Sequence, residues 1–318
     1  MTNEIDNDQL FYEALEENSI SKMRLLPKSD IHNHVGRGGS IEYLGRNKGV
    51  KIPPLETPFD TLGDMQEWFE KYIKIHYPGS NGYLERVKAS FIQGNEDGIE
   101  VLAMSYGIGE IYNLIDMPNF IAIMNQYQMC APKAKFYPEL VLSSSGDLGK
   151  DLEELDYIFS FNYFRSVDWQ GSELNRDVQS IKPMFQKAKD YNLKLKAHVG
   201  EFGTAEHIRE CVEELMLDEI HHGINAVEDV SVMKLLVDRE IQLNVCPTSN
   251  IMLKRSKSYE EHQIRKLVDF GVKVTINSDD LCIFNSSVSD EYLLLYNREV
   301  LSGKELNAIR MNGLKCYD

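Results

Sequence analysis

Eight short apolar segments recur along this chain, and a longer stretch with helical periodicity follows each of them. This alternation constrains the fold more than any other feature, because strands that alternate with helices form parallel sheets. The predicted strands span residues 29–35, 99–107, 138–146, 163–171, 194–201, 219–224, 241–249 and 272–280. Eight strand–helix units of this kind predict an α/β fold, a (β/α)8 barrel of the TIM type.

The length of the chain fits one such barrel with extensions. Barrels of about 250 residues are common, so residues 1–318 are expected to form a single domain. Residues 1–28 form an acidic, amphipathic helical lead-in on this interpretation. Residues 40–98 separate the first two strands and are rich in aromatic side chains, which predicts extra helices that cap the barrel mouth.

Charge and cysteine usage exclude several classes of function. The net charge of −16 argues against binding of nucleic acid polymers or of anionic membranes. No run approaches the ~18 apolar residues of a membrane span, and the acidic N-terminus lacks the pattern of a signal peptide. The five cysteines are scattered without a C-x-x-C pair, so a reducing, cytoplasmic location is expected. The oligomeric state is not indicated.

Candidate ligands and acid–base groups stand at the ends of four predicted strands. Barrel active sites are built at the carboxyl ends of the strands, so these side chains are expected to meet at one rim. The four motifs are His32-x-His34, His198-Val-Gly-Glu201, His221-His222-Gly223 and Ser278-Asp279-Asp280.

These residue types suit a single divalent metal ion. Residues two apart in a strand point the same way, so His32 and His34 can bind one ion while Asn33 points outward. His198 and Asp279 would complete a nitrogen and oxygen set that suits zinc, with a position left for water. Such an ion lowers the pKa of its water from 15.7 to about 7. One Zn²⁺, or another divalent ion, is therefore expected per chain.

Each motif alone is weak evidence for a metal site. An H-x-H pair also occurs among core or surface donors, and Asp-Asp after a strand is more often a turn or a helix cap. His76, His207 and His262 lie outside the strand ends and are expected to be structural. The argument for a site depends on the joint arrangement of the motifs at successive strand ends.

The motifs resemble those of the adenosine and AMP deaminases. HNH, HVGE, HHG, CPTSN and NSDD follow in the family's order, SVDWQGSE from Ser166 is similar to its segment after the fourth strand, and the likeness runs from about Leu26 to Asn312. The resemblance implies a metal-dependent hydrolase that removes the 6-amino group of an adenine nucleoside or nucleotide. Its implied metal ligands are His32, His34, His198 and Asp279.

The same resemblance assigns roles around the purine ring. Glu201 would deliver a proton to N1, and His222 would orient and deprotonate the attacking water. Asp280 would hydrogen-bond N7, and the backbone N–H of Gly171 would face N3. Asp279 is a candidate for catalysis, and His34 and Arg37 are candidates for contact with the substrate. These roles fit the chemistry, because attack at C6 needs a proton at N1 and another for the leaving amine.

Two other hydrolase scaffolds fit the sequence less well. The cytidine deaminase type uses H-x-E with P-C-x-x-C, but here Cys246 precedes Pro247 and no C-x-x-C follows. Two-metal barrels carry a bridging lysine on the fourth strand, and the segment YFRSVDWQG from Tyr163 has none. One metal ion remains the better interpretation.

The chain departs from the family at the sugar end of the substrate. Gly36 stands where adenosine-specific members carry an aspartate, and Arg37 follows it. Ala103 and Ser105 stand where the second strand usually carries Glu and Arg, and Leu281 replaces a proline. A guanidinium beside backbone N–H groups would suit a phosphate, so AMP or dAMP is the expected substrate; the alternative is a solvated Arg37. Deamination of a modified adenine or another amino-heterocycle, or a silent binding protein of this fold, remain the competing functions.

Overall fold

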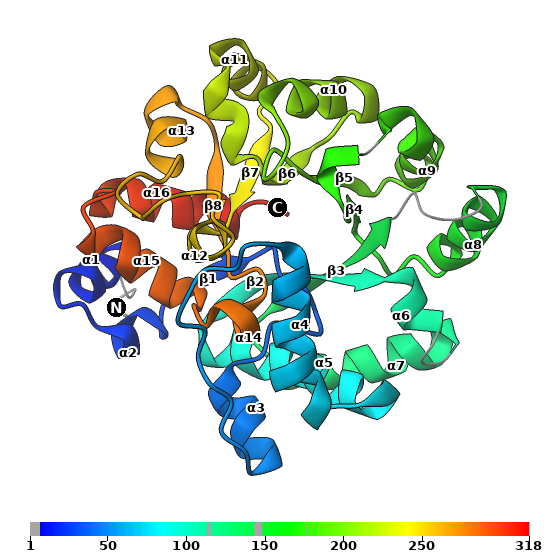
Figure 1. The fold of residues 1–318 in the computed structure, drawn as a ribbon, viewed down its shortest axis with the longest axis horizontal. Helices are drawn as coiled ribbons and strands as arrows, with labels where there is room; N and C mark the ends of the chain where they lie inside the picture. Colours follow the sequence, from blue (N-terminus) through cyan, green and yellow to red (C-terminus); the bar gives the residue numbers. More distant parts are fainter. Residues whose placement is uncertain (1–6, 113–115, 143–147, 176, 318) are drawn as a thin grey trace, which may run out of the picture.

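The strands form one parallel sheet that curves into a nearly closed barrel (Figure 1), as predicted. The computed structural model describes residues 7–112, 116–142, 148–175 and 177–317. Each strand pairs in parallel with the next along the chain. The strands are β1 (Lys28–Asp30), β2 (Ile99–Gly107), β3 (Lys135–Leu142), β4 (Ser166–Trp169), β5 (Lys194–Val199), β6 (Glu219–His222), β7 (Gln242–Val245) and β8 (Val274–Ile276).

The barrel closes just beyond β1 and β8, at the segments that carry two of the predicted motifs. Asn33 and Asp279 form an isolated parallel bridge, and the Asp279 amide donates to the His32 carbonyl at 3.0 Å. The prediction that residues 29–35 form one strand is therefore wrong, because β1 ends at Asp30 and only two isolated bridges follow it, that of Asn33 and one between His34 and Ser105. Asn33 also does not point outward to solvent: it is buried and donates to Asp30 and to Ser278.

The other strand predictions agree in place and differ in length. Residues 99–107 coincide with β2, whereas β3 begins at Lys135, upstream of the predicted start. The predicted continuation over residues 143–146 lies outside the described residues. His198 lies within β5 and His222 ends β6, as predicted, whereas Gly171, Glu201 and Asp279 follow their strands in loops at the barrel mouth.

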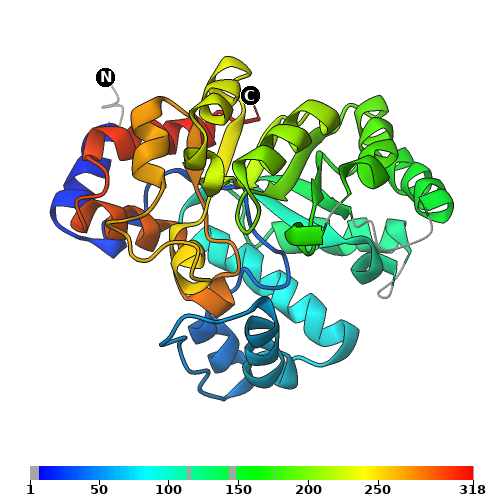
Figure 2. The same cartoon turned by 45° about the horizontal axis from the view of Figure 1, so that its top comes forward.

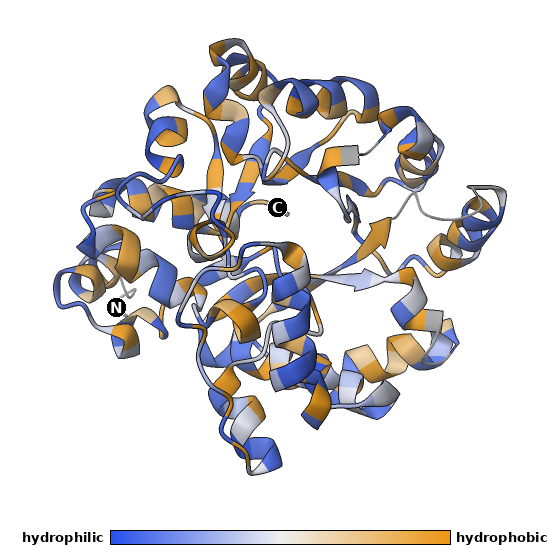
Figure 3. Ribbon diagram, in the orientation of Figure 1, coloured by the Kyte–Doolittle hydropathy of each residue, from blue (hydrophilic) through white to orange (hydrophobic). Residues whose placement is uncertain are grey.

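Amphipathic helices surround the barrel, and α10 (Ala205–Leu215) shows how the sequence specifies them. Its buried residues Ala205, Ile208, Cys211, Val212 and Leu215 have the spacing of one helical face, and Thr204 caps its N-terminus. Figure 3 shows hydrophilic and hydrophobic residues alternating along these outer helices. The others that follow β2 to β8 are α6 (Ile108–Tyr112), α7 (Met117–Gln128), α8 (Leu148–Ser160), α9 (Val178–Asp190), α11 (Val230–Asp238), α12 (Pro247–Met252), α13 (Ile264–Phe270), α14 (Leu281–Phe284), α15 (Val288–Asn297) and α16 (Gly303–Leu314).

Three helices occupy the long connection between β1 and β2: α3 (Ile41–Lys48), α4 (Leu62–Tyr72) and α5 (Gly79–Glu96). They gather on one side of the barrel (Figure 2). A second hydrophobic cluster joins this connection to α14 and to the residue after α12, through side chains such as Phe59, Phe69, Leu253 and Phe284. This packing holds α4 over the carboxyl ends of the strands.

Two helices precede β1 in the described chain, α1 (Asn7–Glu16) and α2 (Ile20–Met23). Phe11, Ala14 and Leu15 of α1 are buried in the main core, where Phe11 makes an edge-to-face contact with Tyr292 of α15. Among the described residues, no helix has the length and apolarity needed to cross a membrane.

Candidate functional site

A cavity of about 610 Å³ opens at the carboxyl ends of the strands. The residues that line it include His34, His198, Glu201, His222, Asp279 and Asp280. Leu62, Met65, Gln66 and Phe69 of α4 line the opposite side. The closure of the barrel thus brings four separated motifs to one cavity under a helical cap. Its volume is in the range of pockets that take drug-sized ligands.

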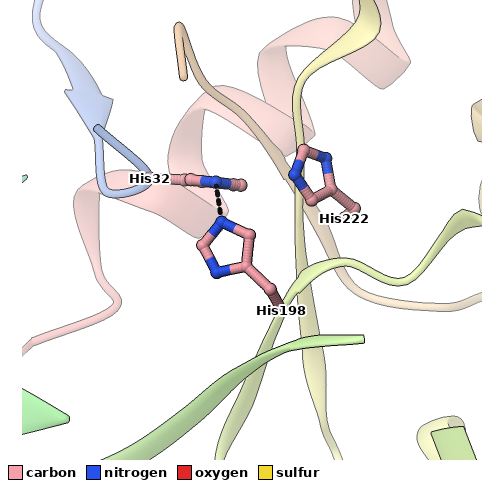
Figure 4. A group of neighbouring side chains, drawn as sticks. All are labelled: His32, His198 and His222. Carbon is pink, nitrogen blue, oxygen red and sulfur yellow. Dashed lines mark hydrogen bonds between the residues drawn. The ribbon is translucent and has the colours of Figure 1, made fainter. Parts of the chain in front are cut away.

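The imidazole rings of His32 and His198 point their Nε2 atoms toward each other. His32 Nδ1 lies 3.0 Å from the Asn244 carbonyl oxygen, to which it donates, so Nε2 of the neutral ring carries the lone pair. His198 Nδ1 lies 2.9 Å from Asp168, which orients that ring in the same way. The two Nε2 atoms are 3.0 Å apart (Figure 4). Burial and the neighbouring imidazoles lower the pKa of His32 well below its usual value, which favours its neutral form with a lone pair on Nε2.

His34 and Asp279 form the other half of the group. His34 Nε2 lies 3.0 Å from Asp279 Oδ1, and the same oxygen lies 3.8 Å from His32 Nε2. Ser105 Oγ lies 3.1 Å from His34 Nδ1. Asp279 has a left-handed backbone (φ 58°), which aspartate adopts at a cost in strain that is common at functional sites.

The donor set fits a divalent cation. Two imidazole lone pairs at 3.0 Å repel each other unless a positive charge lies between them, and a carboxylate is the third neighbour. Nitrogen and oxygen donors of this kind suit zinc. A different grouping, His32, His198 and His222, has its ring nitrogens within 4.8 Å of one another (Figure 4). Geometry alone therefore leaves His222 as a competing ligand.

Glu201 lies in the loop after β5 and is buried beside these groups. Its Oε1 has no hydrogen-bond partner among the described residues, and Oε2 lies 3.6 Å from His222 Nε2. Burial, with Asp279 and Glu173 nearby, raises the pKa of Glu201 well above its usual value. A carboxyl group that keeps its proton at neutral pH can act as a hydrogen-bond donor and as a general acid.

Glu173 holds the loop that carries Glu201. Its carboxylate accepts hydrogen bonds from the backbone amides of Gly200, Glu201 and Phe202. Burial opposes the charge of Glu173, yet His207 and these amides lower its pKa. Glu173 thus fixes the position of Glu201 from the segment after β4.

Asp280 and Arg37 form an ion pair at the edge of the cavity. Arg37 Nη1 lies 2.8 Å from Asp280 Oδ2, and Nη2 donates to Gln66 at 2.8 Å. The guanidinium also lies over the Phe69 ring, 4.6 Å from its centre. Arg37 is therefore neither a solvated loop residue nor an unengaged cation. Asp280 Oδ1 lacks a partner among the described residues.

Gly171 and Gly36 disfavour a side chain for different reasons. Gly171 has φ 111°, a conformation that side chains disfavour, but an added Cβ would meet nothing within 4 Å. A Cβ at Gly36 would lie 3.1 Å from the Tyr83 ring, and the Gly36 carbonyl accepts from Arg86. Tyr83 and Arg86 thus crowd the position where an aspartate was expected.

Sequence reasoning missed the residues that support this group. Asp168, Asn244 and Glu173 orient the rings and the loop, and the sequence analysis gave none of them a role. A sequence signal existed for Asp168 and Glu173, because both lie in the segment SVDWQGSE that resembles the family. His76 and His207 lie away from the ring-nitrogen groupings, whereas His262 is linked to the site through Asn250.

Comparisons with known proteins show which family this chain is similar to. The family model for adenosine deaminase matches residues 147–317. A putative adenosine/adenine deaminase from Treponema pallidum is 30% identical over 275 residues, 86% of this chain and 92% of that protein. An adenine deaminase from Ectopseudomonas mendocina is 34% identical over 323 residues, 92% of this chain and 97% of that protein.

Solved structures share the fold at lower identity. Adenine deaminase from Arthrobacter aurescens has a TM-score of 0.75 at 19% identity, with 91% of this chain and 93% of that chain covered. An amidohydrolase from Burkholderia with bound Zn has a TM-score of 0.75 at 15% identity, covering 96% and 86%. The Arabidopsis ADAL protein complexed with GMP has a TM-score of 0.73 at 16% identity, covering 92% of each chain.

Proposed function

Because this chain belongs to the adenosine deaminase family of metal-dependent aminohydrolases, we propose that it hydrolyses the 6-amino group of an adenine compound to a 6-oxopurine and ammonia. The observation that carries the proposal is the convergence of three kinds of group on one cavity. The first is the metal-binding set, and the second is the buried carboxyl group of Glu201, which keeps its proton. The third is the carboxylate of Asp280, which would bind the purine ring.

His32, His34, His198 and Asp279 would hold one divalent ion, most readily zinc. Their fit is supported by the facing Nε2 atoms of His32 and His198 and by the carboxylate beside them. When bound, the ion acidifies a water molecule so that it attacks at neutral pH. The remaining chemistry falls to the protein's own residues.

Glu201 would donate its proton to N1 of the purine ring as water adds to C6. The unpartnered Oε1 supports this role, because a buried polar atom without a partner needs one from a ligand. His222 Nε2 lies 3.6 Å from Glu201 and 3.8 Å from Asp279 Oδ2, so His222 and Asp279 would flank the attacking water. Asp279 would take one proton from the water and pass it to the 6-amino group, which leaves as ammonia when the C6–N bond breaks. The proton of the C6 hydroxyl group would return to Glu201, which leaves a 6-oxopurine with the donated proton on N1.

Asp280 and Gly171 would recognise the other edge of the base. Asp280 Oδ1, which has no partner among the described residues, is a carboxylate oxygen and would accept a hydrogen bond from N7–H of the 7H tautomer of adenine. The backbone of Gly171 lines the same cavity for contact with N3. The ion pair with Arg37 holds the Asp280 side chain in one orientation. Base recognition would thus depend on a carboxylate that a neighbouring guanidinium positions.

The residues at the end of the cavity where a sugar would lie favour an uncharged substrate, and free adenine above all. The cationic side chains at the cavity are already engaged: Arg37 by Asp280, Lys74 by Glu70 at 2.6 Å, and Arg86 by two backbone carbonyls. A phosphate would have to displace these partners. Gly36 and the crowding by Tyr83 also leave no carboxylate for a ribose. This proposal replaces the expectation of a 5′-monophosphate that Arg37 raised in the sequence. The relatives named adenine deaminase support it.

A nucleotide is the second candidate. The ADAL protein, which shares this fold, is complexed with GMP, and the cavity of about 610 Å³ exceeds what a bare base requires. Rates of ammonia release from adenine, adenosine and AMP by the zinc-loaded protein separate the candidates. The proposal expects kcat/KM to be largest for adenine. A larger value for AMP would favour the nucleotide, and release from none of the three would contradict the proposed function.

A further inference from the structure

His262 is a buried histidine that the mechanism above does not use. It lies just before α13, away from the metal-binding set, and only 2% of its surface is exposed. Its two ring nitrogens both have partners: Ile264 N–H lies 3.0 Å from Nδ1, and Asn250 Oδ1 lies 3.3 Å from Nε2. Asn250 belongs to α12 and is fully buried.

A single backbone amide determines which atoms donate and which accept in this series of hydrogen bonds. An amide N–H can only donate, so His262 Nδ1 accepts from Ile264 and carries no proton. The neutral ring therefore carries its proton on Nε2, which donates to Asn250. The Asn250 atom that faces His262 must then be the carbonyl oxygen. Its amide nitrogen is left to donate in the opposite direction.

That nitrogen faces His222. Asn250 Nδ2 lies 3.1 Å from His222 Nδ1, so Nδ1 of His222 accepts a hydrogen bond and carries no proton. The neutral imidazole of His222 must then carry its proton on Nε2, the nitrogen that faces Glu201 and Asp279. His222 itself is held at the end of β6 in a left-handed backbone conformation (φ 63°).

We infer that His262 and Asn250 are positioning residues that fix His222 in the tautomer with a proton on Nε2. His222 therefore offers an N–H to the cavity and orients its contents as a donor. It has no lone pair there with which to bind a metal ion or to take a proton from water. His222 is therefore excluded as a metal ligand in the grouping of His32, His198 and His222, and Asp279 is retained as a ligand.

The inference deepens the proposed function, since His222 belongs to the same site, but its test does not depend on turnover. Protein labelled with 15N-histidine gives long-range 1H–15N spectra that distinguish protonated from bare ring nitrogens. The His222 signals are assigned by their loss in His222→Gln. We expect a protonated Nε2 and a bare Nδ1 in full-length protein, with and without Zn²⁺. A protonated Nδ1, or an Nε2 signal that becomes metal-bound on addition of Zn²⁺, would overturn the inference.

Three variants test the hydrogen-bond relay, by which we mean the chain from His262 through Asn250 to His222. Asn250→Asp keeps an acceptor for His262 but can only accept from His222, so the His222 proton is expected to move to Nδ1. His262→Leu removes the donor to Asn250, whereas His262→Gln can restore it. We expect kcat to fall about 10- to 100-fold in Asn250→Asp and in His262→Leu, with KM nearly unchanged and partial recovery in His262→Gln.

The matched control is Gln263→Leu, which removes neighbouring hydrogen bonds to Arg255 and Ser256 but leaves the relay intact. It is expected to retain the wild-type His222 signals. Unchanged His222 signals in Asn250→Asp, or equal kcat values for His262→Leu and His262→Gln, would show that the two residues have a structural role only. If the wild-type protein releases no ammonia but shows a protonated Nε2 and a bare Nδ1 for His222, the result would count against the proposed function and not against the relay.

Discussion

The barrel holds two buried polar clusters that differ in how completely their charges are matched. The interior cluster consists of Lys196, Glu139, Glu219 and His221. The rim cluster consists of the proposed metal-binding set with Glu201. Lys196 and His198 are two residues apart on β5, so the two clusters occupy neighbouring levels of the barrel.

In the interior cluster each charge has an opposite partner. Lys196 lies 2.9 Å from Glu139 and 3.3 Å from Glu219, and His221 lies 3.1 Å from Glu139. In the rim cluster two lone pairs face each other and Glu201 Oε1 has no partner among the described residues. Matched buried charges serve the fold, whereas unmatched ones indicate a ligand. Changes in the two clusters should therefore affect different properties.

The largest expected effect is on turnover, in the rim cluster. Glu201→Gln removes the proton for N1, so kcat should fall by about 10²- to 10⁴-fold. Stability should be nearly unchanged, because an amide replaces a carboxyl group that is already neutral. Steady-state kinetics and thermal unfolding check this, with the exposed Glu206→Gln as the control. Turnover within a few-fold of wild type would remove Glu201 from the mechanism.

The interior cluster should respond in stability. Lys196→Met leaves Glu139 and Glu219 buried without their cation, which should cost about 3–5 kcal/mol in the free energy of unfolding. Lys234→Met is the control, because Lys234 pairs with Asp238 at the surface and should cost less than about 1 kcal/mol. Denaturant unfolding measures both. Equal losses would mean that the interior charges are not matched as described.

Acid should weaken the interior cluster in a defined window. Burial opposes the charge of Glu219, but Lys196 and Lys194 lower its pKa from 4.5 to about 2. A depressed pKa stabilises the fold above the unfolded value, and this contribution is lost as the pH falls from about 4.5 to about 2. The free energy of unfolding should decline more gently over this window in Lys196→Met than in wild type. Parallel declines would contradict the assignment.

The smallest expected effect is at the edge of the rim cluster. Arg37→Gln should lower kcat/KM for adenine about tenfold, because Asp280 loses the charged hydrogen bond that orients it. The same variant should leave the ratio of adenine to AMP turnover nearly unchanged. A selective loss of AMP turnover would instead identify Arg37 as a phosphate ligand.

The barrel could be predicted because it depends on a repeated pattern along the whole chain. The rim residues could be predicted because each lies in a recognisable motif at the carboxyl end of a strand: His198 and His222 within β5 and β6, and His32 and Asp279 just after β1 and β8. The partners of these residues could not, since Asp168, Asn244 and Glu173 act through contacts between separate strands and loops. The same holds for the ion pair of Arg37, because its partner Asp280 lies 243 positions away in the chain.

The metal content of the purified chain tests the central claim most directly. Elemental analysis after equilibration with Zn²⁺ should find one ion per chain in wild type and in the control His76→Ala. The ion should be absent from His198→Ala and from Asp279→Ala, since each loses one of the proposed ligands. Two ions per chain, no ion in wild type, or full retention of zinc by Asp279→Ala would contradict the account.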